Sequence, residues 1–257
     1  MSAPLYIHDF ALCSALGFDK KTTWQALKNG VRPPFVQKFF RAKERYVVEI
    51  PRDSLPQVKN AYYDNHVNRL SEAVLAQIET SVQSAVERYG ADRIGVFIGS
   101  SDNGSEASLA GLDTFQKTGA YPENYELKMQ QADFAAEFIA NRFGLKGPIF
   151  THSSACASSA SAFASARNWL EAGFCDAAIV GGVDIATETV VLGFDSLEAV
   201  ALEPTIPFSK NRTGLTIGDG AAYFLISKNP EKARFKVIGI GESSDADHVT
   251  APRADGE

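Results

Sequence analysis

The sequence predicts an α/β domain with a mainly parallel sheet. Two observations carry this prediction: apolar extended runs alternate with helical segments, and no Pro-, Ser- or Gly-rich linker divides the 257 residues. Strands separated by helices require crossover connections, which favour parallel neighbours. The length fits one large domain or two small ones, and the uninterrupted pattern favours one. Only residues 30–65, which hold four prolines among mixed aromatic and charged residues, are predicted to form an irregular surface excursion.

The strands are predicted from short apolar runs. The run IGVFIG within 93–99 is apolar throughout, which is typical of a strand buried on both faces of a parallel sheet. The full set of predicted strands is 6–12, 93–99, 148–150, 177–180, 221–227 and 236–240.

Two helices are predicted between these strands. Apolar residues recur at every fourth position from Val74 to Val86, and the polar residues at 68–71 can supply a helix start. A second helical run, 133–143, closes on Gly144, because glycine readily adopts the left-handed conformation that ends a helix.

Composition excludes several classes of protein. The chain has 31 acidic and 25 Lys or Arg residues, a net charge of −6, with no basic run, which argues against nucleic acid or an anionic membrane as the main partner. The N-terminal residues lack the pattern of a secretory signal, and no apolar run reaches the ~18 residues needed to span a bilayer. A cytoplasmic protein is therefore expected. The three cysteines have no CxxC spacing, so neither a disulfide framework nor a zinc site is predicted.

One cysteine lies where a predicted strand turns into a helix. The strand 148–150 is followed by a helical run of small residues up to Ala166, and Cys156 falls near the turn. Small side chains allow close backbone approach, so this helix is predicted to be buried at the centre of the fold. A thiol at a helix N-terminus can ionise more readily than a free one, and the same end stabilises an oxyanion. This is the geometry that a covalent nucleophile requires.

By position alone, an inert buried role is commoner for a free cysteine. That role is predicted outright for Cys13 and Cys175, which lie on or next to predicted strands. For Cys156 the downstream motifs decide. Gly181 and Gly182 end a buried strand and permit close backbone approach. The glycine-punctuated loop 207–222 matches neither the Walker spacing nor the dinucleotide fingerprint, so nucleotide binding is excluded there.

Taken together, these motifs resemble those of the β-ketoacyl-[acyl-carrier-protein] synthases, the condensing enzymes of fatty-acid and polyketide synthesis. The resemblance extends over nearly the whole chain and is weakest across 30–90. The segments that carry it are 98–100, 144–148, 154–159, 181–182, 207–221 and 243–252.

The resemblance implies a thiolase-like fold, in which two βαβαβ halves form a layered α/β/α/β/α sandwich. Residues 1–257 would be the β-ketoacyl synthase N-terminal domain, the first half of that sandwich, and the C-terminal half would be absent from this chain.

The resemblance also implies a reaction. Cys156 would accept an acyl group from the phosphopantetheine of a carrier protein, and a carbanion formed by decarboxylation of malonyl-carrier would then attack that thioester. This acyltransferase needs no cofactor and no metal. The implied partners are acyl carrier protein and a second subunit, in a homodimer or with a partner synthase subunit.

Further residues gain roles only through the resemblance. Phe194 matches a position that lines the acyl pocket, and Thr250 lies where the pantetheine arm approaches. Asp102 and Asp133 fall at positions near the acyl pocket where relatives often carry apolar or amide side chains. A carboxylate is costly to bury unpaired, so these two residues argue against a long alkyl substrate.

The histidines depart from the family pattern. Related synthases complete the site with two histidines and a lysine from a second half, and none of His8, His66, His152 and His248 matches those positions. We therefore expect a fragment of a longer synthase that does not condense by itself. The alternatives are a non-condensing relative, either a transacylase or a chain-length-factor-like subunit, and a carrier-protein-binding module. Retention of Cys156 argues against the chain-length factor, in which that residue is usually replaced.

Overall fold

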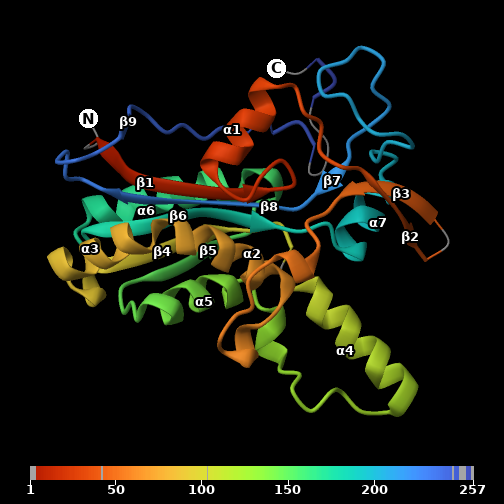
Figure 1. Ribbon diagram of the computed structural model, residues 1–257, viewed down its shortest axis with the longest axis horizontal. Coiled ribbons are helices and arrows are strands. Elements are labelled where there is room, and N and C mark those ends of the chain that lie inside the picture. Colours follow the sequence, from red (N-terminus) through yellow and green to blue (C-terminus); the bar gives the residue numbers. More distant parts are fainter. Residues whose placement is uncertain (1–3, 42, 103, 245, 249–252, 256–257) are drawn as a thin grey trace.

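The computed structural model describes residues 4–41, 43–102, 104–244, 246–248 and 253–255. Its centre is a six-stranded sheet with the order β5-β4-β6-β8-β1-β9 (Figure 1). The bounds of its strands are β1 Leu5–Ser14, β4 Ile94–Gly99, β5 Ile149–His152, β6 Ala177–Asp184, β8 Gly220–Ser227 and β9 Phe235–Val237. Each predicted strand overlaps one of these.

The sheet is mixed, which corrects the prediction of a mainly parallel one. β4 pairs in parallel with both β5 and β6, whereas β8 is antiparallel to β6 and β1, and β9 is antiparallel to β1. The parallel strands are joined by helices that pack on the sheet. β8 follows a long connection that leaves the sheet after β6, and such a connection imposes no parallel direction.

Helices cover both faces of this sheet (Figure 1). One face packs against α2 (His66–Leu75), α3 (Glu79–Tyr89) and α5 (Phe134–Phe143), and the other against α6 (Ser158–Glu171). Side chains alternate along a strand, so successive β4 residues enter different cores: Val96 and Ile98 pack on the first face, and Phe97 on the second. Burial on both faces explains why this strand is apolar at every position.

α6 is only partly buried, which corrects the prediction that this helix is buried at the centre. Its sheet-facing residues include Ala162, Ala166 and Leu170, all inaccessible to solvent, whereas Ser159 and Ala160 are exposed. The small residues are needed for close packing on the sheet, but sequence pattern alone does not say whether a second layer covers the opposite side.

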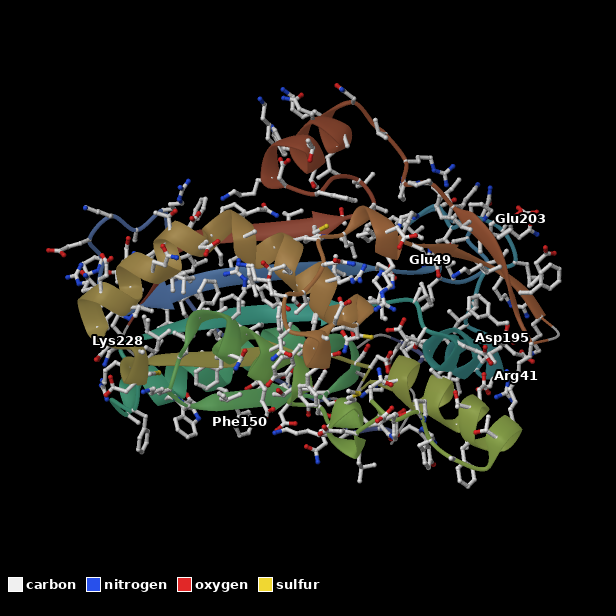
Figure 2. All side chains as sticks on the ribbon, turned by 60° about the horizontal axis from the view of Figure 1, so that its bottom comes forward. Arg41, Glu49, Phe150, Asp195, Glu203 and Lys228 are labelled. Atoms are coloured by element: carbon white, nitrogen blue, oxygen red, sulfur yellow. The ribbon has the colours of Figure 1, made fainter. Side chains whose placement is uncertain are left out.

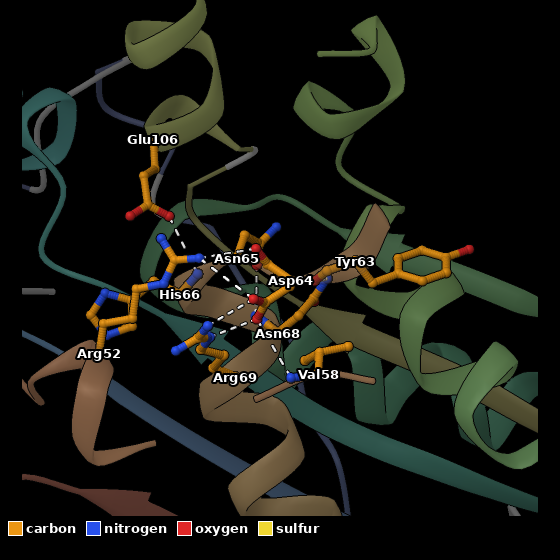
Figure 3. A network of polar contacts seen from close by, with 9 residues as sticks. All are labelled: Arg52, Val58, Tyr63, Asp64, Asn65, His66, Asn68, Arg69 and Glu106. Atoms are coloured by element: carbon orange, nitrogen blue, oxygen red, sulfur yellow. Dashed lines mark hydrogen bonds and ion pairs between the residues drawn. The ribbon is translucent and has the colours of Figure 1, made fainter. Parts of the chain in front are cut away.

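Helix α2, on the face of the sheet opposite α6, begins earlier than predicted. The Asn65 side chain accepts a hydrogen bond from the amide of Asn68 (2.8 Å), so the cap lies before the predicted start at 68–71. Figure 3 shows the polar network around this end of the helix, in which the Arg69 guanidinium donates hydrogen bonds of 2.6 and 2.7 Å to the two carboxylate oxygens of Asp64. The polar residues Asn68, Arg69 and Ser71 instead lie inside α2 and are buried, in this network and against the sheet. After α2, a 3₁₀ turn (η3, Ala76–Ile78) leads into α3.

The segment 30–65 contains a β-hairpin, so the prediction of an irregular excursion is wrong. β2 (Val36–Phe40) pairs antiparallel with β3 (Lys43–Val48), and β3 pairs in parallel with β7 (Ile217–Gly218), forming a second sheet of three strands. Most of β2 is exposed, so its sequence lacks the apolar alternation by which a half-buried strand is recognised.

Contacts from a distant helix hold this hairpin. Asp195 on α7 (Glu188–Ser196) forms ion pairs with Lys43 and Arg45 of β3, the latter at 2.6 Å (Figure 2 labels Asp195). The hydrogen bond from Lys43, followed by that from Arg45, holds the pKa of Asp195 below its usual value. The hairpin is therefore fixed by partners about 150 residues away.

Two further helices lie outside the layers (Figure 1). α1 (Lys20–Lys28) begins with a capping box at Asp19, and α4 (Ser105–Thr118) projects from the body. The remaining short 3₁₀ turns are η1 Arg52–Ser54, η2 Ala61–Tyr63, η4 Ala91–Arg93, η5 Leu127–Gln130 and η6 Ala155–Ala157. Within the described residues, none of the helices combines the length and apolarity that crossing a membrane requires.

Candidate active site

Cys156 lies on a tight turn between β5 and α6. The turn η6 contains Ala155, whose φ of 49° lies in the left-handed region that side chains other than glycine seldom adopt. Ser158 fastens the turn: its hydroxyl donates to the Ala155 carbonyl (2.6 Å) and accepts from the Ser154 amide (2.9 Å). Cys156 itself is exposed. The structure thus places this thiol at the start of the helix, where the sequence predicted it, and leaves it open to reagents.

The other two thiols are enclosed in the two cores. Cys13 is 1% exposed and Cys175 is fully buried. Burial raises the pKa of each thiol to about 11, and the neighbouring carboxylate of Asp219 adds to the shift at Cys13. Their surroundings are those of inert core cysteines.

These environments predict selective alkylation. Iodoacetamide at pH 8 is expected to modify Cys156 and to leave Cys13 and Cys175 unmodified until the chain unfolds, because buried, protonated thiols react slowly. Peptide mass spectrometry after timed alkylation, with and without urea, measures this. Modification of Cys13 or Cys175 at the rate of Cys156 in the native protein would contradict it.

The same pKa shifts predict a loss of stability at high pH. The folded pKa of about 11 lies above the ordinary value of 9.0, so the native state keeps these thiol protons longer than the unfolded state does. The stabilisation that these two protonated thiols contribute to the free energy of unfolding is complete below about pH 9, and it is lost as the pH rises towards 11. Urea unfolding at pH 8 and pH 10.5 checks this, and the Cys13→Ala variant should show a smaller decline.

Two glycines allow α6 to approach the sheet closely. A Cβ atom placed on Gly99 would lie 2.3 Å from the Ser158 carbonyl carbon, and one on Gly182 would lie 2.8 Å from the Ser159 Cβ. Gly99 and Gly182 are register partners on β4 and β6. The first turn of α6 therefore rests on the carboxyl ends of these parallel strands, and Cys156 lies at that edge of the sheet.

A cavity of about 580 Å³ adjoins the same part of α6. Ser159, Ala160 and Phe163 line it from the helix, and the ends of β1, β6 and β8 supply its other walls. The volume is within the usual range for small-molecule pockets, about 300–1,000 Å³.

The four histidines lie in different parts of the structure. His8 hydrogen-bonds Ser227 (2.8 Å), and His66 Nε2 lies 3.5 Å from Asp219. His152 ends β5, where burial lowers its pKa, and its Nε2 has no hydrogen-bond partner among the described residues. His248 is exposed in the C-terminal segment. In the described part of the chain, no hydrogen bond joins a histidine to Cys156.

The residues assigned by resemblance are spread over several elements. Phe194 lies on α7 and is partly exposed, while Thr250 falls outside the described residues. Asp102 is buried, and its carboxylate accepts a hydrogen bond from the Ser105 amide (3.1 Å) at the start of α4. Asp133 directly precedes α5 and is partly buried. The buried carboxylate of Asp102 is therefore partnered by the Ser105 amide.

Sequence reasoning missed the buried carboxylate of Asp219. This residue sits in the glycine-punctuated loop and accepts hydrogen bonds from the amides of Ile50 (2.9 Å) and Ala186 (2.7 Å). An acidic residue between two glycines before an apolar strand was the available signal. Its partners lie 169 and 33 residues away, so the sequence could not name them.

The chain is similar to known proteins of one family. Residues 11–232 match the family model described as Beta-ketoacyl synthase, N-terminal domain. The 3-oxoacyl-[acyl-carrier-protein] synthase 2 of Staphylococcus aureus is 28% identical, over 95% of this chain and 65% of that protein. Nodulation protein E of Rhizobium meliloti is 31% identical over 72% of this chain and 48% of that protein.

Solved structures show the same likeness. A ketosynthase from Xenorhabdus doucetiae, solved in complex with its chain length factor, superposes with a TM-score of 0.88 at 31% identity, over 99% of this chain and 65% of that one. A β-ketoacyl synthase from Burkholderia phymatum gives 0.79 at 24% identity, which shows the fold. The chain spans about two thirds of the length of such relatives. With its thiolase-like fold, it belongs to the β-ketoacyl synthase family and matches the N-terminal domain of that family.

Proposed function

We propose that this chain carries the acyl-accepting site of a β-ketoacyl-[acyl-carrier-protein] synthase, with Cys156 as the nucleophile. The observation that carries the proposal is the position of that thiol: it is the exposed cysteine, on a left-handed turn directly ahead of α6, while the other two are buried. Family membership supports it.

The proposed acylation is a thioester exchange. The Cys156 sulfur attacks the carbonyl carbon of an acyl thioester on carrier phosphopantetheine, a new C–S bond forms, and the pantetheine thiol leaves with its electron pair and takes up a proton. The positive end of the α6 dipole favours negative charge on the attacking sulfur and on the tetrahedral oxyanion. No metal or organic cofactor enters this exchange.

The second proposed step is condensation. Loss of carbon dioxide from malonyl-carrier leaves a carbanion that attacks the Cys156 thioester, forms a C–C bond and returns the thiolate. This step needs proton donors aimed at the developing charge. No histidine of the described residues is bonded to Cys156, so acylation is the step that we assign to the residues described here. Phe194 and Thr250 remain our proposals for acyl and pantetheine contacts. Since Cys156 must stay reduced, we also propose a cytoplasmic location.

The acylation proposal is tested by intact-protein mass after incubation with an acyl-carrier thioester. We expect the mass of one acyl group to be added, and peptide mapping to place it on Cys156. Carrier binding without a mass gain would instead support a binding module. Acylation mapped to Cys13 or Cys175 would contradict the proposed nucleophile.

We further propose that the chain pairs with a second subunit through β5. This strand lies at the edge of the sheet, and its Ile149 and Phe150 are 39% and 43% exposed. Figure 2 shows Phe150 at the outer margin of the molecule. An exposed apolar edge strand is a ready template for strand pairing.

Phe150→Glu is expected to weaken self-association at least tenfold. If two copies of β5 face one another, the substitution brings two carboxylates into proximity and removes apolar contact. Sedimentation velocity over a concentration series measures the effect. Phe235→Glu on β9, the opposite edge of the sheet, is the matched control and should leave association unchanged. A wild-type monomer at every concentration, or dissociation by the β9 variant alone, would exclude this interface.

A further inference from the structure

Asp184, the last residue of β6, is bonded to the segment that follows β4. Its Oδ1 accepts hydrogen bonds from the Ser101 amide (2.7 Å) and the Ser101 hydroxyl (2.8 Å). The Ser100 hydroxyl (3.2 Å) and the Asp102 amide (3.3 Å) are also within hydrogen-bond distance of this oxygen, but each has a competing acceptor inside the segment: the Asp102 carbonyl lies 3.0 Å from the Ser100 hydroxyl, and that hydroxyl lies 3.3 Å from the Asp102 amide. Residues 100–102 begin the connection from β4 to α4 and are called here the β4 loop. One carboxylate oxygen is thus bonded directly to Ser101 and lies against both of its neighbours.

The β4 loop is also tied to the strand that leads to Cys156. The Ser100 amide donates to the His152 carbonyl (3.1 Å), at the end of β5 and four residues before the thiol. Just before the loop, Gly99 lies so close to α6 that a Cβ there would be 2.3 Å from Ser158. The loop is therefore bonded to the end of β6 at Asp184 and to the end of β5 at His152, the strand that leads into the Cys156 turn.

Asp184 also borders the space beside α6. It lines the 580 Å³ cavity together with Ser159 and Ala160, which follow Cys156 by three and four residues. A shift of Asp184 would therefore move a wall of this cavity. Gly99, the residue next to the β4 loop, packs so closely on α6 that a displacement at this point is transmitted to the start of the helix.

We propose that Asp184 is a positioning residue of the acylation site, which holds the β4 loop so that an incoming acyl thioester is seated at Cys156. The proposal rests on the proposed function and extends it to a residue that acts through the loop. A charged acceptor suits this role, because hydrogen bonds to an ionised group are stronger than those between neutral groups. Asparagine at 184 keeps the shape and one carbonyl oxygen but removes the charge.

The test compares two reactions of the same thiol. Asp184→Asn is expected to slow acylation of Cys156 by butyryl and octanoyl thioesters roughly tenfold or more, since small misplacements of bound substrate are amplified in rate. Alkylation by iodoacetamide, which needs no acyl seat, should change less than about threefold. Asp184→Glu, which restores the charge, should recover part of the loss.

Asp113→Asn, an exposed aspartate on α4, is the matched control and should react like wild type. Parallel loss of acylation and alkylation in Asp184→Asn, or no loss of either, would overturn the proposal. If wild-type Cys156 accepts no acyl group, the proposed function fails. Hydrogen exchange then decides whether Asp184 positions the loop: amides of residues 100–102 must exchange faster in Asp184→Asn than in Asp113→Asn, and equal rates refute it.

Discussion

Cys156→Ala will abolish the acyl-dependent mass gain, with a fall of roughly 10⁴-fold or more in the acylation rate, as expected when a covalent nucleophile is removed. The physical reason is that alanine offers no atom to form the new C–S bond, and the remaining thiols cannot substitute. Cys13 and Cys175 are buried, with pKa values raised to about 11. Time courses of intact mass with an acyl-carrier thioester measure the effect.

Two controls separate chemistry from folding in this experiment. Cys156→Ser replaces the thiol with a hydroxyl and should also lose acylation, because no base is hydrogen-bonded to residue 156 in the described structure to activate a hydroxyl. Cys13→Ala should retain the mass gain, although it is expected to lower stability by deleting a buried side chain. A mass gain that persists in Cys156→Ala would refute the assignment of the nucleophile.

Asp219→Ala is expected to lower the free energy of unfolding by about 3–5 kcal/mol. The Asp219 side chain is 1% exposed and joins three parts of the chain through the amides of Ile50 and Ala186. Alanine would leave both buried amides without an acceptor, each costing about 1–3 kcal/mol. It would also remove the charge that faces His66 at 3.5 Å. Urea unfolding followed by circular dichroism measures the change.

Asp219→Asn keeps one acceptor and should lose about half as much stability. Asp113→Ala, at an exposed position on α4, is the matched control and should stay within about 0.5 kcal/mol of wild type. If Asp219→Ala unfolds at the same urea concentration as Asp113→Ala, the carboxylate does not clamp these segments.

The central sheet was predictable because its strands are buried on both faces. The run at 94–99 is apolar at every position, and it forms β4 between two helical layers. The end of α5 was predictable for a local reason, since Gly144 adopts the left-handed conformation that closes the helix. The hairpin at 36–48 was not predictable, because β2 is largely exposed and the ion-pair partner Asp195 is remote.

The candidate site divides in the same way. The strand, the turn and the run of small residues placed Cys156 at the start of a helix, because each signal is local. Strand direction was different: β8 returns antiparallel, and only pairing partners distant in the chain determine that. The roles of Asp184 and Asp219 depend on donors 33 to 169 residues away, which no local pattern encodes.

By itself, therefore, the sequence determined the layered α/β class, the family resemblance and the position of one thiol at a strand-to-helix turn. The burial of Cys13 and Cys175 was also predicted and is confirmed. Tertiary structure alone decided that the thiol at the turn is exposed, that α6 is only partly buried, and which amides each buried carboxylate binds. The physical reason is range: backbone preference and apolar periodicity act over a few residues, whereas exposure and hydrogen-bond partnership are properties of segments brought together by the fold.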